Sequence, residues 1–533
     1  MSRLARIWTA ALLAAAFLGS ALAAPTMVYL EHSDTLSFDE ERLPGCQILS
    51  GDVRFRHDSV LMFCDSAFFY DESNLINAYG HIRIEQGDTL FVYGDRLFYN
   101  GDTRMARLRE HVRMVSTSMT LYTDSLNYDR NTNVGYYFNH GKIVDSTNVL
   151  TSVNGWYYTD SDEAVFQRQV VLTNPSFVMH SDTMHYNTNS RIATIVGPST
   201  IDYDSTHIYS EAGWYNTVTE RSKLHKNSRI NDREGRSMTG DTLYYRRAEQ
   251  VAEGFSNVCL RDSAQQLQVQ GNYGIYHEDT KEGFMVDRAT LVEFSSPDSL
   301  FLTADTLFYA SEDSITTLRA NYHVQAWQID VQGLCDSAFY STADSTLWMH
   351  GYPVIWNDNN QISGDQIQVL MANGQAKEAI VDGNAFVFRA EPDSAYNQIS
   401  GKKITGYIEE GHLRKIFVNG NAVSVYYAVE EDSTRSYADT SAYIGINRTE
   451  SSELTIYMND DKTIKRIVMT PASSGVMYTP DKLTDYKISR LDGFINYESL
   501  RPQDQEDIYV TKDRSAFTQV QEENTKHHRK RRK

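Results

Sequence analysis

The chain has 533 residues, and its 70 acidic against 50 basic side chains give a net charge of −20, which disfavours binding to nucleic acids. It contains 34 Tyr and 22 Phe but only 10 Pro, a composition typical of pleated β-strands. After the N-terminus no stretch approaches the roughly 20 apolar residues of a membrane-spanning helix. Composition therefore predicts a β-rich protein that is soluble or peripheral to a membrane.

The N-terminus has the features of a secretory signal peptide. Two arginines precede an apolar run over residues 7–18, and an A-x-A cleavage site ends at Ala23. We therefore expect residues 1–23 to be removed. Residues 24–44 then form a short lead-in before the rest of the chain.

Secretion would place the cysteines in a compartment that permits disulfides. Two alternatives follow from the sequence: the cysteines are small buried hydrophobic residues, or the first two of them form a disulfide. Their spacing and the absence of a CxxC motif do not suggest a metal site or redox catalysis. The four residues are Cys46, Cys64, Cys259 and Cys335.

A five-residue motif recurs over residues 45–428. It consists of Asp, then Ser, Thr or Arg, then Leu, Met or Ala, then any residue, and finally Tyr or Phe. The clear copies begin at Asp65, Asp95, Asp124, Asp182, Asp241, Asp305 and Asp336, and degenerate copies begin at Asn154, Glu211, Asn272, Asp365 and Lys402. Successive copies start 28–37 residues apart. A steady period near 30 residues predicts an architecture of about twelve repeats.

Each repeat also contains a second β-segment, such as residues 80–84 (GHIRI), so we expect two strands per repeat. Within the motif, Leu97 and Tyr99 are two residues apart and share one face of a strand, which is apolar in every clear copy. Arg96 and Phe98 lie on the opposite face. This alternation favours an antiparallel sheet with one covered face.

The apolar face of the motif supplies the candidate ligand-lining residues. A stripe of twelve copies is longer than one globular core, so it either fills a long solenoid or lines a long groove, and the pattern alone leaves both open. As lining of a lipid groove, the candidates are Phe69, Leu97, Tyr99, Leu126, Tyr128, Met184, Tyr186, Leu243, Tyr245, Leu307, Tyr309 and Tyr340.

The motif Asp requires a separate explanation, because carboxylates about 5 Å apart on neighbouring strands repel one another. A small residue precedes most copies, which predicts a bend or bulge where the carboxylate accepts backbone N–H bonds and turns toward solvent. Calcium ligation is an alternative, although the D-x-D-x-D loops of calcium repeats are missing. No repeat carries a distinct cluster of catalytic groups, so we expect neither an enzyme nor a bound cofactor.

Residues 94–99 (GDRLFY) and 240–245 (GDTLYY), with following strands such as residues 78–82 (AYGHI), resemble the repeats of the OstA/LptA-like family of organic-solvent-tolerance and lipopolysaccharide-transport proteins. The resemblance covers residues 45–425. It implies an all-β, elongated repeat β-jellyroll, open along one edge, that holds lipid A acyl chains between two sheets.

The resemblance also implies a periplasmic location, associated with the outer or inner membrane, and end-to-end strand pairing with other lipopolysaccharide-transport proteins. The implied role is a transport bridge for outer-membrane assembly. An extracellular structural or adhesive β-solenoid without lipid cargo is the alternative, because the stripe itself does not distinguish lining residues from core residues.

The C-terminal part departs from the repeat. The period decays near Val429, and residues 429–515 are expected to form a β-rich cap of the kind that covers the exposed end of a repeat array. Residues 516–533 end in a basic run from Lys526 to the C-terminus. This run is interpreted either as a solvated, disordered tail or as a segment attracted to anionic lipid headgroups.

Overall fold

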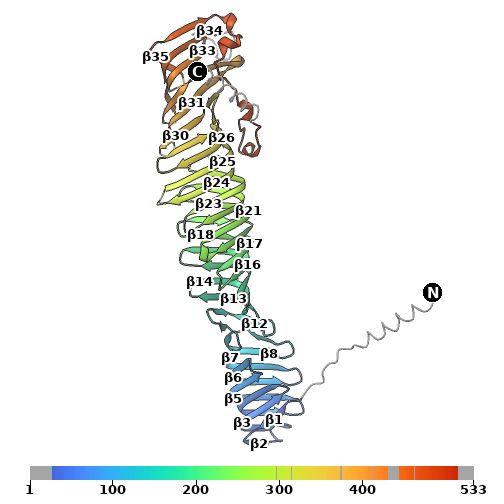
Figure 1. Ribbon diagram of the computed structural model, residues 1–533. Coiled ribbons are helices and arrows are strands. Elements are labelled where there is room, and N and C mark those ends of the chain that lie inside the picture. The colour runs from blue at the N-terminus through green and yellow to red at the C-terminus, as the bar shows by residue number, and fades with distance from the viewer. Residues whose placement is uncertain are drawn as a thin grey trace, which may run out of the picture. The chain divides into compact units, whose positions relative to one another are not determined.

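The computed structural model describes residues 27–295, 297–313, 315–372, 375–410, 412–429, 443–460 and 463–513. The expected signal peptide and basic tail lie outside these residues. The chain divides into two units: unit 1 contains Met1–Asp204 and Ala212–Thr219, and unit 2 contains Ser205–Glu211 and Glu220–Lys533. Within the described residues both units are built from antiparallel β-strands, which confirms the predicted all-β class (Figure 1).

The strands of unit 1 are β1 (Tyr29–His32), β2 (Thr35–Phe38), β3 (Gln47–His57), β4 (Val60–Tyr70), β5 (Leu75–Gln86), β6 (Leu90–Asn100), β7 (Met105–Val115), β8 (Thr120–Asp129), β9 (Val134–Tyr137), β10 (Gly141–Val144), β11 (Val149–Ser152), β12 (Asn154–Tyr158), β13 (Glu163–Asn174), β14 (Phe177–Asn187) and β15 (Ile192–Asp202). Strand β16 (Thr206–Asn216) contributes its first part to unit 2 and its second part to unit 1.

The strands of unit 2 continue with β17 (Arg221–His225), β18 (Arg229–Asp232), β19 (Arg236–Thr239), β20 (Thr242–Arg246), β21 (Val251–Asp262), β22 (Leu267–His277), β23 (Glu282–Glu293), β24 (Leu300–Glu312), β25 (Ile315–Gln328), β26 (Val331–Ser341), β27 (Thr346–His350), β28 (Val354–Asn357), β29 (Asn360–Ser363), β30 (Gln366–Ala372), β31 (Gln375–Glu391), β32 (Ala395–Glu409), β33 (His412–Val429), β34 (Tyr443–Met458), β35 (Ile464–Thr470) and β36 (Ser474–Tyr478).

Each long strand pairs with the next one along the chain, as β3 to β8 do in unit 1 and β21 to β26 do in unit 2. At some positions two separate short strands, one in each half-sheet, take the place of one long strand. Strand β8, for example, pairs with β9 through one half and with β10 through the other. Two half-sheets therefore run side by side through each unit, as a β-jellyroll requires.

A bulge near the middle of the long strands separates the two half-sheets. In β5 the register shifts between Tyr79 and Ile82, and the two residues between them, Gly80 and His81, both have positive φ. Because side chains alternate along a strand, an irregular bulge of this kind changes which residues face inward. In β4 every second residue is buried from Val60 to Cys64. After the irregularity the alternation begins again at Ala67, three residues after Cys64 instead of two. Both halves therefore turn their apolar residues toward the same interior.

The motif Asp lies opposite this bulge. The Asp65 carboxylate is 2.7 Å from Nδ1 of His81, and the same pair recurs at 2.6 Å between Asp95 and His111. In other repeats Asn takes the place of His, as in the 2.8 Å bond from Asn257 to Asp241. A bulge is therefore present, but it lies in the strand opposite each Asp rather than at the small residue before it. The carboxylates accept hydrogen bonds from side chains at that bulge rather than from backbone N–H groups.

The side-chain partners follow from the geometry of the bulge. Gly80 has φ +77°, and a Cβ there would lie 2.3 Å from Oδ2 of Asp65. The first bulge position is therefore crowded by the carboxylate, and the second position supplies the polar partner. The hydrogen bond to Asp65 raises the pKa of the His81 imidazole, and the one to Asp95 raises that of His111.

The four cysteines are free thiols, and Cys46, Cys64 and Cys335 are buried. Cys46, just before β3, and Cys64, on β4, therefore do not form the disulfide that the sequence left open. Burial raises the pKa of the Cys64 thiol to about 12, which keeps it protonated at neutral pH. The alternative of buried small hydrophobic residues describes these positions.

After β36 the chain forms short helical turns: η4 (Pro480–Lys482), α2 (Tyr486–Ser489), η5 (Glu498–Leu500) and η6 (Asp507–Tyr509). We call residues 486–512 the strap. Figure 1 shows this red segment beside the strands of unit 2. It passes from β34 back toward β23, so it covers a side of the stacked strands, whereas a cap was expected over their end.

Candidate functional site: the interior between the half-sheets

The two half-sheets present different inner faces. Half-sheet A is the set of strand halves that carry the motif Leu and Tyr, and half-sheet B is the set on the other side of the bulges. Inner residues of neighbouring strands lie directly opposite one another, so each half-sheet presents a row of side chains that crosses the strands.

On half-sheet A the row alternates between Tyr and a small residue. Tyr99 pairs with Ala106, which pairs with Tyr128, which pairs with Gly135 in unit 1. Unit 2 repeats the pattern from Tyr245 through Ala252, Tyr276 and Gly283 to Tyr309. The small residues leave space for the rings of the neighbouring strands, and the five tyrosines named are at most 4% exposed.

On half-sheet B the corresponding row is aliphatic. In unit 1 it contains Met62, Ile84, Val92, Met114, Leu121, Ile143, Leu150, Leu172, Met179 and Ile201. In unit 2 it continues as Ile208, Ile230, Met238, Leu260, Val269, Leu291 and Leu302. All of these residues are buried. An aliphatic wall of this kind is chemically suited to hydrocarbon and offers it no polar contacts.

The Tyr hydroxyls of half-sheet A reach across the mouth of the interior to the tips of half-sheet B. In unit 1 the Tyr99 hydroxyl lies 2.5 Å from Nδ1 of buried His57, and Arg130 donates to the same oxygen at 2.7 Å. The Tyr186 hydroxyl donates to the carboxylate of Asp145 at 2.8 Å. We call each such contact a latch, because it closes the edge that an open jellyroll would leave accessible.

Unit 2 contains latches of the same kind. The Tyr309 hydroxyl donates to Asp262 at 2.6 Å across the mouth. The Tyr245 hydroxyl lies 3.5 Å from Thr206 at the tip of half-sheet B, and it donates to Glu278, which follows β22 at the edge of half-sheet A, at 2.9 Å. Burial, followed by the Asp262 carboxylate, raises the pKa of Tyr309 to about 12. The hydroxyl therefore stays protonated and remains a hydrogen-bond donor at neutral pH.

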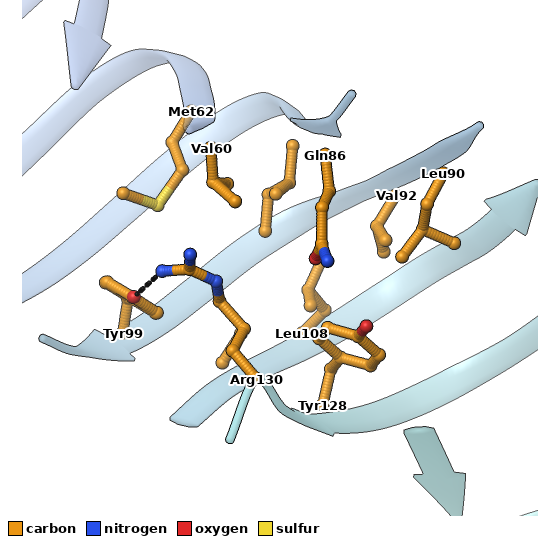
Figure 2. Close-up of a pocket in the computed structure, with 11 residues that line it drawn as sticks. Val60, Met62, Gln86, Leu90, Val92, Tyr99, Leu108, Tyr128 and Arg130 are labelled. Carbon is orange, nitrogen blue, oxygen red and sulfur yellow. Dashed lines mark hydrogen bonds between the residues drawn. The ribbon is translucent and has the colours of Figure 1, made fainter. Parts of the chain in front are cut away.

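Latched repeats leave almost no free space inside. The cavity between β4 and β8 in unit 1 has a volume of about 10 Å³, comparable to one water molecule. Figure 2 shows its lining, in which side chains such as Val60, Met62 and Val92 lie around the polar contact between Arg130 and Tyr99. An acyl chain requires the latches to part before it can enter these repeats.

The interior of unit 2 changes after Tyr309. The row on half-sheet A continues through Leu318, Tyr340, Leu347, Val369, Ala379, Gly406 and Ile416, and all seven are half-buried. The row on half-sheet B becomes half-buried at Ala326, Ile355, Ile362, Val387 and Ile399. Solvent therefore reaches the aliphatic rim of the interior from β25 to β33, which we call the open section, whereas inner residues nearer the bulges, such as Ile367 and Val381, stay buried.

Two of the three motif copies in the open section have lost the Tyr that forms the latches. The copy that starts at Asp365 has Val369 in its place, and the copy that starts at Lys402 has Gly406. Tyr340 keeps its ring, but it is only half-buried. Without a hydroxyl at the edge of half-sheet A, nothing analogous to the Tyr309–Asp262 contact joins the two walls at these copies.

Comparison with protein families agrees with this architecture. A family model described as OstA-like protein matches residues 25–182 and 178–296, just over half of the chain. The chain belongs to the OstA-like family. This is a family of transport and binding proteins. No curated protein matches the chain.

The interior of this OstA-like chain contains the lining residues expected from the motif. Eleven of the twelve are at most 4% exposed and point between the half-sheets, and Tyr340 is the half-buried exception. Sequence reasoning missed the accessible residues of half-sheet B, such as Ile355, Ile362 and Ile399. The signal that marks this section is the degeneration of the motif after Tyr340, where the Tyr position becomes aliphatic or Gly.

Two further observations limit the chemistry of the OstA-like fold. Within the described ranges, no group of three or more His, Cys, Asp or Glu side chains is arranged to hold a metal ion. The helices of the described part also lack the length and hydrophobicity of a membrane span. The titratable groups identified at the interior are those of the latches, where they form hydrogen bonds between the walls.

Proposed function

We propose that the protein is a periplasmic lipopolysaccharide-binding transport protein that holds lipid A acyl chains between its half-sheets. The observation that carries this proposal is the two-walled aliphatic interior, solvent-accessible in the open section and closed by Tyr latches elsewhere. Acyl chains need apolar lining, and burying each CH₂ group stabilises binding by about 0.8 kcal/mol. In this proposal the phosphates and sugars of the lipid remain outside the mouth of the jellyroll.

The proposal assigns different roles to the two kinds of repeat. The open section accepts acyl chains without rearrangement of its walls. The latched repeats admit them when hydrogen bonds such as Tyr309–Asp262 exchange for bonds to water or to a polar headgroup. Because one such bond contributes only about 1 kcal/mol net, individual latches can open while the sheet ladders stay intact.

Transport along a bridge also needs contacts with further proteins. Strands β1 and β2 each pair only with β3 among the described residues, and β35 and β36 each pair only with β34. Such edges present unpaired backbone groups for strand addition. End-to-end pairing with other lipopolysaccharide-transport proteins, and attraction of the basic C-terminal run to an anionic membrane surface, complete the proposed role.

The proposal is tested by the lipids that co-purify with the full chain from a periplasmic extract. Native mass spectrometry is expected to find lipopolysaccharide bound to the wild type. Val369→Glu, which places a carboxylate in the open section, should abolish the bound lipid. Gln368→Glu, on the outer face of the same strand, should retain it. A wild-type chain free of lipid would favour the structural or adhesive solenoid instead.

A further inference from the structure

The outer face of half-sheet B in unit 2 carries a row of alternating glutamine and apolar side chains. Gln332 pairs with Trp356, which pairs with Gln361, which pairs with Phe388, which pairs with Gln398. All five residues are at most 4% exposed. They are buried although they face away from the interior, because the strap runs along this row.

Two of the glutamines hold the strap backbone in the same way. The Gln398 amide donates to the carbonyl of Ser489 at 2.7 Å and accepts from the N–H of Leu491 at 2.9 Å. The Gln361 amide donates to the carbonyl of Ile495 at 2.9 Å and accepts from the N–H of Tyr497 at 2.8 Å. Each glutamine amide therefore bonds the C=O of one strap residue and the N–H of the residue two positions later. The edge of a neighbouring β-strand would make the same two hydrogen bonds.

Apolar anchors alternate with these clamps. Leu491 packs in a cluster with Phe386, Val425 and Ile446, and Phe494 lies 5.2 Å from Phe388 between ring centroids. Further along, Tyr497 and Leu500 are buried against Leu334, Val354 and Trp356. Buried anchors in a desolvated row are the features that dominate peptide recognition.

The far end of the strap is held by different contacts. The Gln325 amide donates to the carbonyls of Ile508 and Val510, and Thr303 donates to the Ile508 carbonyl at 3.0 Å. The glutamine and threonine contacts join strap backbone to side chains of the sheet. The strap is therefore a ligand of a preformed face rather than a strand of the sheet.

The strands beneath the strap are those that wall the open section. On β28 Trp356 faces the strap and Ile355 faces the interior. On β32 Gln398 faces the strap and Ile399 faces the interior. Half-sheet B is thus aliphatic on its inner face, and its outer face carries apolar side chains and amide groups whose packing and hydrogen bonds the strap supplies. Without the strap it loses its outer packing, and its inner face gains most by collapsing onto half-sheet A.

We propose that the outer face of half-sheet B is a peptide-binding site whose ligand is the strap, and that its occupancy holds the lipid-binding open section apart. The second half of this inference rests on the proposed function, and the first half does not. The ligand class is an extended peptide with apolar anchors beside free backbone groups, at the spacing of Leu491, Ile495 and Tyr497. The strap of the same chain fills the site, and a separate peptide of the same kind can replace it.

The test uses the full chain with the strap weakened by Leu491→Ser and Tyr497→Ser, which leaves the face intact. The probes are a labelled synthetic peptide of residues 486–512 and a fluorescent long-chain fatty acid. The peptide is expected to bind the variant about tenfold more tightly than the wild type, whose site is occupied. The fatty acid is expected to bind the variant about tenfold more weakly, and saturating peptide should restore its affinity.

Matched substitutions separate the site from the rest of the sheet. Adding Gln361→Ala and Gln398→Ala to the strap variant should abolish peptide binding, whereas adding Gln368→Ala, on the outer face of half-sheet A, should not. Equal peptide binding by wild type and variant, or none by a variant with wild-type circular dichroism, overturns the peptide site. Fatty-acid affinity unchanged by the strap variant overturns the coupling.

A measurement on the unsubstituted chain covers the case in which the variant fails to fold. Hydrogen exchange at the Leu491 and Tyr497 amides is expected to slow when the wild type binds fatty acid, because coupling between the two sites is reciprocal. Exchange that is unchanged by bound fatty acid contradicts the coupling. A wild type that binds no fatty acid at all rejects the proposed function, while the peptide measurements still decide the peptide site.

Discussion

The repeats up to Tyr309 and the repeats after it are built on the same strand-and-bulge plan but differ at the mouth of the jellyroll. Before this point, buried tyrosines alternate with small residues, and the hydroxyls of Tyr99, Tyr186 and Tyr309 latch the two walls together. After it, Tyr340 is only half-buried, Val369 and Gly406 stand at the next two Tyr positions, and the edge of the interior is half-exposed. The contacts that close the mouth therefore distinguish the two kinds of repeat.

The difference predicts unequal costs for the same substitution at equivalent inner positions. Leu243, which is fully buried in a latched repeat, should lose about 2–5 kcal/mol of unfolding free energy on substitution by Ala. Leu347, half-buried in the open section, should lose less than about 2 kcal/mol in Leu347→Ala. Native-state hydrogen exchange of β20 and β27 measures both. Equal losses would show that the open section is as tightly packed as the latched repeats.

The latch itself is expected to have the next largest effect. Tyr309→Phe removes the donor to buried Asp262 and should destabilise unit 2 by about 1–3 kcal/mol, because a buried carboxylate loses one of its partners. It should also raise lipid uptake by the latched repeats. Tyr340→Phe is the control, with no measurable loss expected at its half-buried site. Denaturant unfolding of both variants checks the prediction, and an equally large loss for Tyr340→Phe would contradict it.

The pH dependence of the latches is a third way to compare repeats. Burial raises the pKa of Glu278 above its ordinary value, although Tyr245 and Thr206 donate hydrogen bonds to it. The unfolded chain ionises at the ordinary, lower pKa. The contribution of Glu278 to stability is therefore complete below that value and is lost as pH rises through the raised pKa of the folded state.

The latch on Asp145 has the opposite sign. Burial acts to raise the pKa of Asp145, but hydrogen bonds from Thr147, Asn148 and Tyr186 outweigh it and leave the pKa lowered. Its contribution is present above the ordinary pKa and is lost as pH falls through the lowered one. Hydrogen exchange followed from about pH 2 to pH 8 should show the Glu278 trend in unit 2 and, below the ordinary Asp pKa, the Asp145 trend in unit 1. Glu278→Gln should remove the trend in unit 2, and a trend that persists in this variant would assign it to another group.

The bulge contacts are expected to have the smallest effect and to be alike in both kinds of repeat. His111 bonds to Asp95 in a latched repeat, and Asn384 bonds to Asp365 in the open section, in both cases at the exposed surface. Exposed pairs of this kind contribute little. His111→Ala and Asn384→Ala should both leave the thermal midpoint unchanged. A large shift in only one of them would show that the bulges also differ between the regions.

The sequence predicted the fold well because its strongest signals are local. Period-two alternation at Leu97 and Tyr99 identified the inner face, and the small residue before Asp95 indicated a bulge, which lies in the opposite strand. The bulge partner was not predictable in the same way, because His111 lies 16 residues from Asp95 and meets it only through strand register.

The candidate site was predicted only in part, for a related reason. The motif identifies side chains that point inward, but burial depends on what closes the mouth. Latches join residues such as Tyr99 and His57, which are 42 positions apart. The open section lies where the motif degenerates, and a degenerate repeat was read as a weaker copy rather than as a site. The family match likewise ends at residue 296, before the open section begins.

The most direct test of the central claim is photocrosslinking in cells from paired positions on the two faces of half-sheet A. The account predicts strong capture of lipopolysaccharide from a probe at Val369, weaker capture from Tyr245 behind its latch, and none from the adjacent outer positions Gln368 and Tyr244. Equal labelling from Val369 and Gln368 would contradict the assignment of the lipid to the space between the half-sheets.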